Sequence, residues 1–431
     1  MRSTWFGRMV ATAALALLVP SSALALQPLA TFLAGTKENN PDARVADATI
    51  HQREAEVDLA RARLLPSFAA RGVLTHNQYE AVAQLPGASA PLVIIPQNQL
   101  DAFLVLDVPI ADLSQFSRYD TQKIQLALSR ATQGLTHRQL SERVVRSYYL
   151  VIATSALRQA TDKSLALSEQ NLGLVKDRVA AGVAPPLDLE RATANLERAR
   201  QDVADAELAR VLATRSLATI TRVTPEPPTA FPEDDLHEET ALAIWLGQGK
   251  ESLPEYKIAE NEAKLADATR RTANLAYLPS LSAQAQERFT NATGFTGRVS
   301  SYTLSATLSF RFDLGLLAQQ DVAKAQAAAT AARADGTKRN VEDAIVEAWH
   351  RTGTGIAKAR AARAQVKAAD SAARIAQDRY SSGASTQLDV TQAQRDAFTA
   401  NVARIQAELD VTQARAILRI AAGKSSELMQ K

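Results

Sequence analysis

Residues 178–192 read RVAAGVAPPLDLERA, and residues 379–393 read RYSSGASTQLDVTQA. Each stretch has an arginine, a glycine four residues later and a Leu-Asp pair that begins five residues after the glycine, and the two lie 201 residues apart. The same offset relates Asp112 to Asp313 and Ala213 to Ala414. Agreement in one register along the chain predicts a duplication of one structural unit.

A second shared motif sets the boundaries of the two units. Leu65-Pro66-Ser67 recurs as Leu278-Pro279-Ser280 at an offset of 213, so the first unit has 12 extra residues, in the interval that contains the loop 77–98. We therefore expect a first repeat at 26–222, a linker at 223–253, a second repeat at 254–423 and a C-terminal tail at 424–431.

Each repeat is expected to contain one very long helix. Residues 113–180 and 315–380 contain no proline, and each range spans about 100 Å as a helix at 1.5 Å per residue. The shorter helices expected at 37–64, 188–220, 254–277 and 386–421 are about half as long, so two of them placed end to end flank one long helix. Alanines seven apart, at 192, 199, 206 and 213 and again at 393, 400, 407 and 414, favour a packed coiled coil over a solvated alanine-rich helix.

Two extended segments separate the helices in each repeat. We expect strands at about 67–76 and 99–109 in the first repeat and about 281–290 and 299–312 in the second. The last segment alternates apolar residues with Ser301, Thr303, Ser305, Thr307 and Ser309. About 10 residues with one apolar face is the length of a tilted transmembrane strand, although an ordinary sheet packed on one face shows the same alternation. Four strands cannot close a barrel alone, so several chains would have to share one.

The N-terminus and the composition exclude several classes of protein. Residues 1–25 have a basic start, an apolar run and an Ala-Leu-Ala site, which predicts a cleaved export signal. A net charge of +3 argues against a nucleic-acid partner. The chain has no cysteine and five scattered histidines, so we expect no metal site, no cofactor and no enzymatic activity.

The signal peptide, the duplicated halves, the Leu-Pro junctions and the Gly-x-x-x-x-Leu-Asp turns together resemble the TolC-type outer-membrane efflux proteins over the whole mature chain. The resemblance implies a fold that is mainly α with a β-barrel portion: a homotrimer with a 12-stranded barrel in outer-membrane lipid and a periplasmic helical tunnel. It also implies a periplasmic adaptor protein and an inner-membrane pump as partners. The chain would then be a passive duct of an efflux or type I secretion system in the outer membrane of a Gram-negative bacterium.

The same resemblance assigns functional residues to the turns. The adaptor would dock at two tips, Ala181-Gly182-Val183 and Ser382-Gly383-Ala384, whereas a simple turn would need only the glycine. By similarity Asp389 lines the periplasmic constriction, and Asp188 helps to hold it closed with Tyr380. Each aspartate is alternatively a first-turn residue stabilised by the helix dipole. Ser385 and Gln392 depart from the family pattern, so the whole gating network is not transferred.

The alternation also predicts which residues face a pore. Ser301, Thr303, Ser305, Thr307 and Ser309 would line the lumen and the apolar set would face lipid, provided that the register is correct. Two other classes of protein compete with the channel: a periplasmic adaptor, which would have one hairpin and compact β domains, and a structural coiled-coil protein, which would need no strands. The exported substrate and the cognate pump are not determined by these residues.

Overall fold

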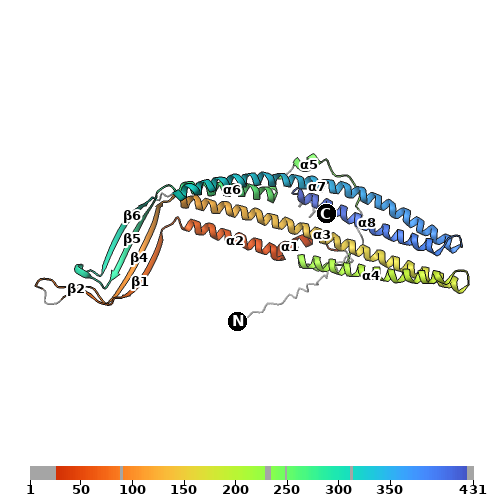
Figure 1. Ribbon diagram of the computed structural model, residues 1–431, viewed down its shortest axis with the longest axis horizontal. Helices are drawn as coiled ribbons and strands as arrows, with labels where there is room; N and C mark the ends of the chain where they lie inside the picture. Colours follow the sequence, from red (N-terminus) through yellow and green to blue (C-terminus); the bar gives the residue numbers. More distant parts are fainter. Residues whose placement is uncertain (1–25, 88–90, 229–233, 248–249, 311–313, 425–431) are drawn as a thin grey trace, which may run out of the picture.

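The computed structural model describes residues 26–87, 91–228, 234–247, 250–310 and 314–424. The expected signal peptide at 1–25, residues 311–312 of the last expected strand and residues 425–431 of the tail lie outside these ranges. Within them the protein is elongated, with helices over most of its length and a β-sheet at one end (Figure 1).

Two long helices run from the sheet to the far end of the molecule. They are α3 (Leu113–Ala180) and α7 (Leu314–Ser381), and α4 (Pro186–Thr221) and α8 (Gln387–Ala421) return along them for about half their length (Figure 1). Asp112 caps the start of α3, where its Oδ1 accepts a hydrogen bond from the N–H of Gln115 at 3.0 Å. The sheet-proximal half is filled by α2 (Pro41–Ala62) and α6 (Pro254–Leu275).

The first short helix differs from the expectation of a single helix at 37–64. The chain forms α1 (Leu29–Asn39), then breaks at Asn40 and continues as α2. Pro41 has no N–H and holds the preceding residue in an extended conformation, so Asn40 ends one helix and caps the next by accepting from the N–H of Asp42 at 2.9 Å. The expected start at 37 was therefore wrong, and the Asn-Pro pair was the signal for the break.

The linker expected at 223–253 is more ordered than a simple connection. It contains α5 (Leu242–Gly247) and a 3₁₀ turn at Lys250–Ser252. Its residue Leu236 is buried among Ile356, Ala359 and Val411 of the second hairpin. The linker therefore packs on α7 and α8 at the middle of the molecule, where α5 lies beside α7 in Figure 1.

Four long strands form one antiparallel sheet in the order β1-β4-β5-β6. They are β1 (Ser67–His76), β4 (Asn98–Ala111), β5 (Ser280–Thr290) and β6 (Ser300–Ser309). The loop expected at 77–98 holds an additional small hairpin of β2 (Ala81–Ala83) and β3 (Leu92–Ile95), which the sequence did not predict. The mainly helical fold with strands at one end is confirmed, and the sheet of a single chain is open at β1 and β6.

Small residues allow the helices to pack closely. Ala192, Ala199, Ala206 and Ala213 are all buried, as the heptad predicted, and the first and last of them pack with residues of α3. In α8 only Ala400 and Ala407 of the corresponding set are buried. There Gly355 of α7 faces Val411 of α8, and a Cβ added to the glycine would lie in ordinary van der Waals contact with the Cα of Val411, at 3.4 Å.

No helix in the described part of the chain has the length and apolar character that a membrane span requires.

Candidate channel and tip sites

Both helical hairpins end in the same glycine turn. Gly182 has φ +74° and Gly383 has φ +80°, a backbone conformation that side chains with a Cβ rarely adopt. In the first turn Val183 N–H donates to the carbonyl of Arg178 at 3.0 Å, and in the second Ala384 N–H donates to that of Arg379 at 2.7 Å. The expected tip residues 181–183 and 382–384 are all exposed. The turns therefore present two small surfaces, of which Val183 is the apolar part.

Tyr380 binds the two hairpins together just above the turns. It is 3% exposed and packs with Val175 and Ala192 of the first hairpin and Val390 of its own. The guanidinium of Arg178 lies 4.7 Å from the centre of its ring, and Arg178 Nη1 donates to its carbonyl oxygen at 2.7 Å. Burial raises the pKa of the Tyr380 hydroxyl. Separating the hairpins at the tip therefore requires breaking this contact.

Asp188 and Tyr380, which the resemblance pairs, share no hydrogen bond within the described part of the protomer. The Tyr380 hydroxyl has no partner there, and the mostly buried carboxylate of Asp188 lies 3.8 Å from Nη1 of Arg191 on its own helix. Asp188 is nevertheless near enough for its charge to contribute to the raised pKa of Tyr380.

Asp389 is exposed and already has a local role. Its Oδ2 accepts from the N–H of Thr386 at 2.9 Å, from Thr386 Oγ1 at 2.8 Å and from Ser385 Oγ at 3.1 Å, which completes a capping box at the start of α8. The Thr386 N–H, followed by the two hydroxyls, lowers the pKa of the carboxyl. Ser385, which departs from the family pattern, therefore supports the carboxylate. Gln392 instead donates to Asp396 at 2.9 Å.

Above the tip the hairpins separate around a cavity of about 850 Å³. Its lining includes Asn171, which is 2% exposed and whose amide atoms have no hydrogen-bond partner in the described structure. A second apolar contact, between Ala153 and Ala160 on α3 and Ile405 and Leu409 on α8, closes the hairpins together again nearer the middle. The interface between the hairpins is therefore apolar at both ends and polar between them.

The register of the sheet places the hydroxyl row of β6 on one face with polar residues of β5. Ser301, Thr303, Ser305, Thr307 and Ser309 lie opposite Arg288, Gln286, Gln284, Ser282 and Ser280. Large apolar side chains project from the other face and are uncovered, as Tyr302 (76% exposed), Leu74 (74%) and Phe68 (69%) show. An uncovered apolar face of this size requires lipid or another protein.

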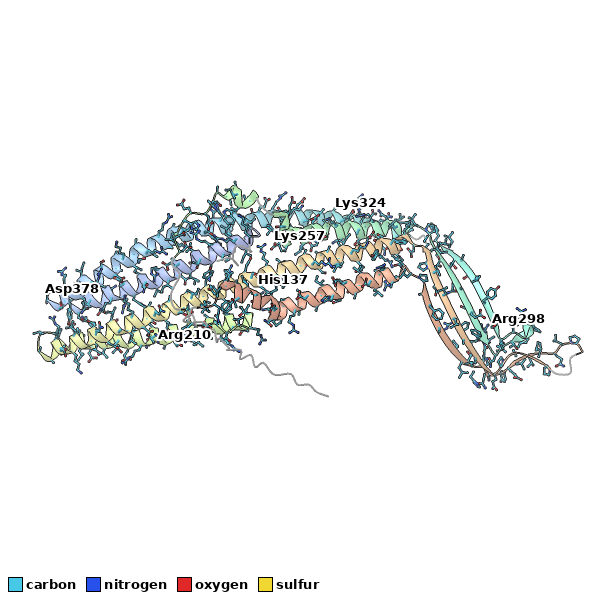
Figure 2. All side chains as sticks on the ribbon, turned by 180° about the vertical axis from the view of Figure 1, so that it is seen from behind. His137, Arg210, Lys257, Arg298, Lys324 and Asp378 are labelled. Carbon is cyan, nitrogen blue, oxygen red and sulfur yellow. The ribbon has the colours of Figure 1, made fainter. Side chains whose placement is uncertain are left out.

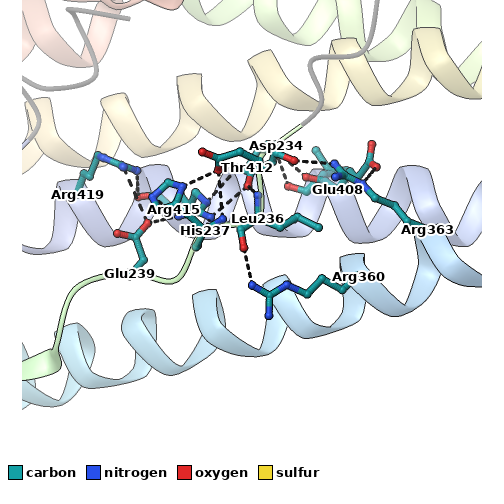
Figure 3. Close-up of polar contacts among 12 residues, drawn as sticks. Asp234, Leu236, His237, Glu239, Arg360, Arg363, Glu408, Thr412, Arg415 and Arg419 are labelled. Atoms are coloured by element: carbon teal, nitrogen blue, oxygen red, sulfur yellow. Dashed lines mark hydrogen bonds and ion pairs between the residues drawn. The ribbon is translucent and has the colours of Figure 1, made fainter.

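Sequence reasoning missed two groups of residues. Arg178 crosses to the other hairpin at Tyr380, whereas its repeat counterpart Arg379 donates from Nη2 to the carbonyl of Ala384 in its own turn, at 3.4 Å. The second group ties the linker to α8, where the buried Arg415 contacts Asp234, His237 and Glu239 (Figure 3). Its partners are about 180 residues away in the chain, so no local pattern announced the contact.

The profile of the outer membrane efflux protein family matches residues 34–221 and 245–424. The chain belongs to this family. It is an outer-membrane efflux channel protein, which favours the channel over the adaptor and coiled-coil alternatives.

Relatives of known name agree with this assignment. The chain is 26% identical to the probable efflux pump outer membrane protein TtgC and to the antibiotic efflux pump outer membrane protein ArpC, both of Pseudomonas putida, over 85% of this chain and 77% of each relative. Solved structures share the fold. A membrane protein from Pseudomonas aeruginosa has a TM-score of 0.79 at 21% identity, covering 92% of this chain and 93% of that one. The Campylobacter jejuni outer-membrane channel CmeC also scores 0.79, at 17% identity over 93% and 86%.

Proposed function

We propose that three copies of the chain close a 12-stranded barrel by pairing β1 of one copy with β6 of the next. The observation that carries this proposal is the open four-stranded sheet with an uncovered apolar face. β1 and β6 are each 10 residues long and run in opposite directions, so they can form one more antiparallel pair. Three sheets of four strands exceed the roughly eight strands at which side chains fill a barrel's interior.

In this trimer the hydroxyl row of β6 faces the lumen and the apolar face contacts outer-membrane lipid. The helices continue the lumen into the periplasm over about 100 Å. The duct is passive and narrowest at the glycine turns. There three copies of Asp389 form an acidic ring that favours cations, and Asp188 with Tyr380 contributes to closure.

The exposed turns are the docking surface for a periplasmic adaptor, which connects the channel to an inner-membrane pump. Support comes from the two equivalent tips, each with an exposed glycine and small neighbours that permit close approach of a partner helix. The cavity above the tips interrupts the packing between the hairpins, so opening the tip breaks the Tyr380 cluster without unpacking the helices along their whole length. The pump supplies the energy and selects the substrate.

Single-channel conductance in a planar lipid bilayer tests the constriction. We expect discrete steps from the wild type, and larger or less cation-selective steps from Asp389→Ala. Glu260→Gln, which removes an exposed charge from the sheet-proximal helix α6, serves as the control and should leave the steps unchanged. If Asp389→Ala leaves the steps unchanged, Asp389 does not line the constriction. If the wild type gives no conductance steps at all, the proposed pore is refuted.

Cysteine cross-linking tests the trimer, since the chain has no cysteine of its own. Val73 of β1 lies on the same face of the sheet as Ser301, Thr303 and Ser305 of β6. Oxidation of Val73→Cys combined with a cysteine at one of these three positions should give a dimer and trimer ladder. Leu74→Cys, combined with the same β6 cysteines, points to the opposite face and should give no cross-linked ladder. Equal cross-linking of the Val73→Cys and Leu74→Cys variants would contradict the pairing of β1 with β6.

A further inference from the structure

A row of three large side chains crosses the hydroxyl face of the sheet. Arg71 on β1 lies opposite Phe103 on β4, and Phe103 lies opposite Arg288 on β5. The next position in the row is Ser301 of β6, a residue of the proposed lumen surface. Because opposed residues on paired strands share a face, all of these side chains lie on the lumen side if the proposed function is correct.

Phe103 lies between two guanidinium groups. The Cζ atom of Arg71 is 5.0 Å from the centre of the ring, and that of Arg288 is 5.8 Å from it. Both distances fall within the range of cation–π attraction. The aromatic ring thereby fixes the positions of two positive charges on neighbouring strands.

Only one of these charges is balanced. Arg288 pairs with Asp101, whose Oδ1 lies 3.0 Å from Nε and 2.9 Å from Nη2. Asp101 is 5% exposed and also accepts from Gln99 at 2.7 Å, so its carboxylate is fully engaged.

Arg71, by contrast, is exposed and makes no ion pair with any residue that the structure describes. The other carboxylate of β4 on this face, Asp107, lies four residues further toward the helices, about 13 Å at 3.3 Å per residue. It accepts a hydrogen bond from Gln284 at 2.8 Å. The row therefore carries a net charge of +1 in each copy, located at Arg71, whose five N–H donors suit oxygen acceptors.

We propose that Arg71, held against Phe103, is an anion-binding site in the outer part of the barrel lumen, occupied by phosphate, sulfate or carboxylate groups. Three copies surround the pore in the trimer. The site gives the outer end of the duct a preference for anions, opposite in sign to the acidic ring proposed at the periplasmic tip. This inference rests on the proposed trimeric pore, because the hydroxyl face must line the lumen.

The test is block of single-channel current by sodium tripolyphosphate. The long helical part cannot cross a bilayer, so protein added to one chamber presents the outer end of its sheet to the opposite chamber, where the polyanion is added. We expect concentration-dependent block of the wild type. One unit charge pair at about 4 Å in water changes a binding constant about fivefold, so Arg71→Gln should weaken the block at least fivefold.

Two further variants separate charge from folding and position. Arg71→Lys keeps the charge and should keep most of the block. Arg298→Gln removes the same charge at the far end of the sheet (Figure 2) and should change the block less than twofold. Discrete conductance steps without polyanion show that each variant still forms the pore.

Equal block in the wild type and Arg71→Gln would overturn the site. Loss of block in Arg298→Gln alone would do the same by placing anion binding at the rim. Channels that conduct but are not blocked by the polyanion refute this inference and leave the proposed function intact. If no channels form at all, the proposed pore itself is refuted.

Discussion

The contact that holds the linker on α8 makes a sharp prediction about Arg415→Met. Arg415 is 5% exposed, and its guanidinium lies 2.9 Å from Oδ2 of Asp234 and 2.5 Å from Oε1 of Glu239 (Figure 3). Its Nη2 also donates to the carbonyl of His237 at 2.6 Å. The carboxylate side chains are only 11% and 9% exposed, so methionine would leave two buried negative charges without their main partner.

Removing one partner of a buried ion pair costs about 3–5 kcal/mol. At about 1.4 kcal/mol per factor of ten, the population with the linker detached should rise by roughly two to three and a half powers of ten. Hydrogen exchange read out by peptide reports this population, since Leu236 is 6% exposed among residues of α7 and α8 and its N–H is protected while the linker stays packed there. Protection of the tip turns should not change.

The matched control is Glu238→Gln in the same segment. Glu238 is 80% exposed and 3.5 Å from an exposed Arg360, so its loss should cost less than about 1 kcal/mol. Adding Asp234→Asn and Glu239→Gln to Arg415→Met should restore part of the linker's protection from hydrogen exchange, because the two buried carboxylates that lost their partner are then neutral. Linker exchange in Arg415→Met within threefold of that in Glu238→Gln would refute the reasoning.

Three other predictions concern packing and pH. A Cβ on Gly35 would lie 2.7 Å from Cγ2 of Val223, so Gly35→Ala should cost about 1–3 kcal/mol and lower the melting temperature, whereas Gly173→Ala, with open space around it, should not. The pKa of Asp389 is lowered from 3.8, so its capping contribution is complete above that value and disappears as pH falls through the lower folded-state pKa. The carboxylate therefore stays charged, and cation selectivity should stay constant from about pH 8 to 5. A fall in selectivity near neutral pH would contradict this expectation. Burial raises the pKa of Tyr148 from 10.0 to about 12, so its stabilising contribution is complete below pH 10.0 and is lost as pH rises toward about 12. Tyr148→Phe should reduce the alkaline loss of stability in a titration, and the raised pKa values of Tyr149 and Tyr380 should leave the remainder.

Local patterns determined most of the elements because each depends on short-range chemistry. The absence of proline allowed two long helices, and the glycine at each turn supplied the positive φ that ends them. Alternation in β6 located a strand with two unlike faces, and the register then carried that difference across the sheet. The break at Asn40 was also encoded locally, although the expected helix boundary ignored it.

Candidate sites were predicted less well than elements. The positions of Gly182 and Gly383 followed from the repeat, and both turns are exposed. The tertiary structure gives repeat-related residues different contacts. Arg178 crosses to the other hairpin, whereas Arg379 stays at its own turn. Asp389 completes a capping box, whereas Asp188 faces Arg191.

The sequence by itself therefore determined the repeat, the helix and strand pattern and the turns, because these depend on residues within a few positions of one another. Only the tertiary structure brought Arg178 to Tyr380, Arg415 to Asp234, and Arg71 and Arg288 to Phe103. In each case the partners are far apart in the chain, and their pairing depends on which helix or strand packs beside which. That choice is made by the burial of side chains over whole elements, which no local pattern records.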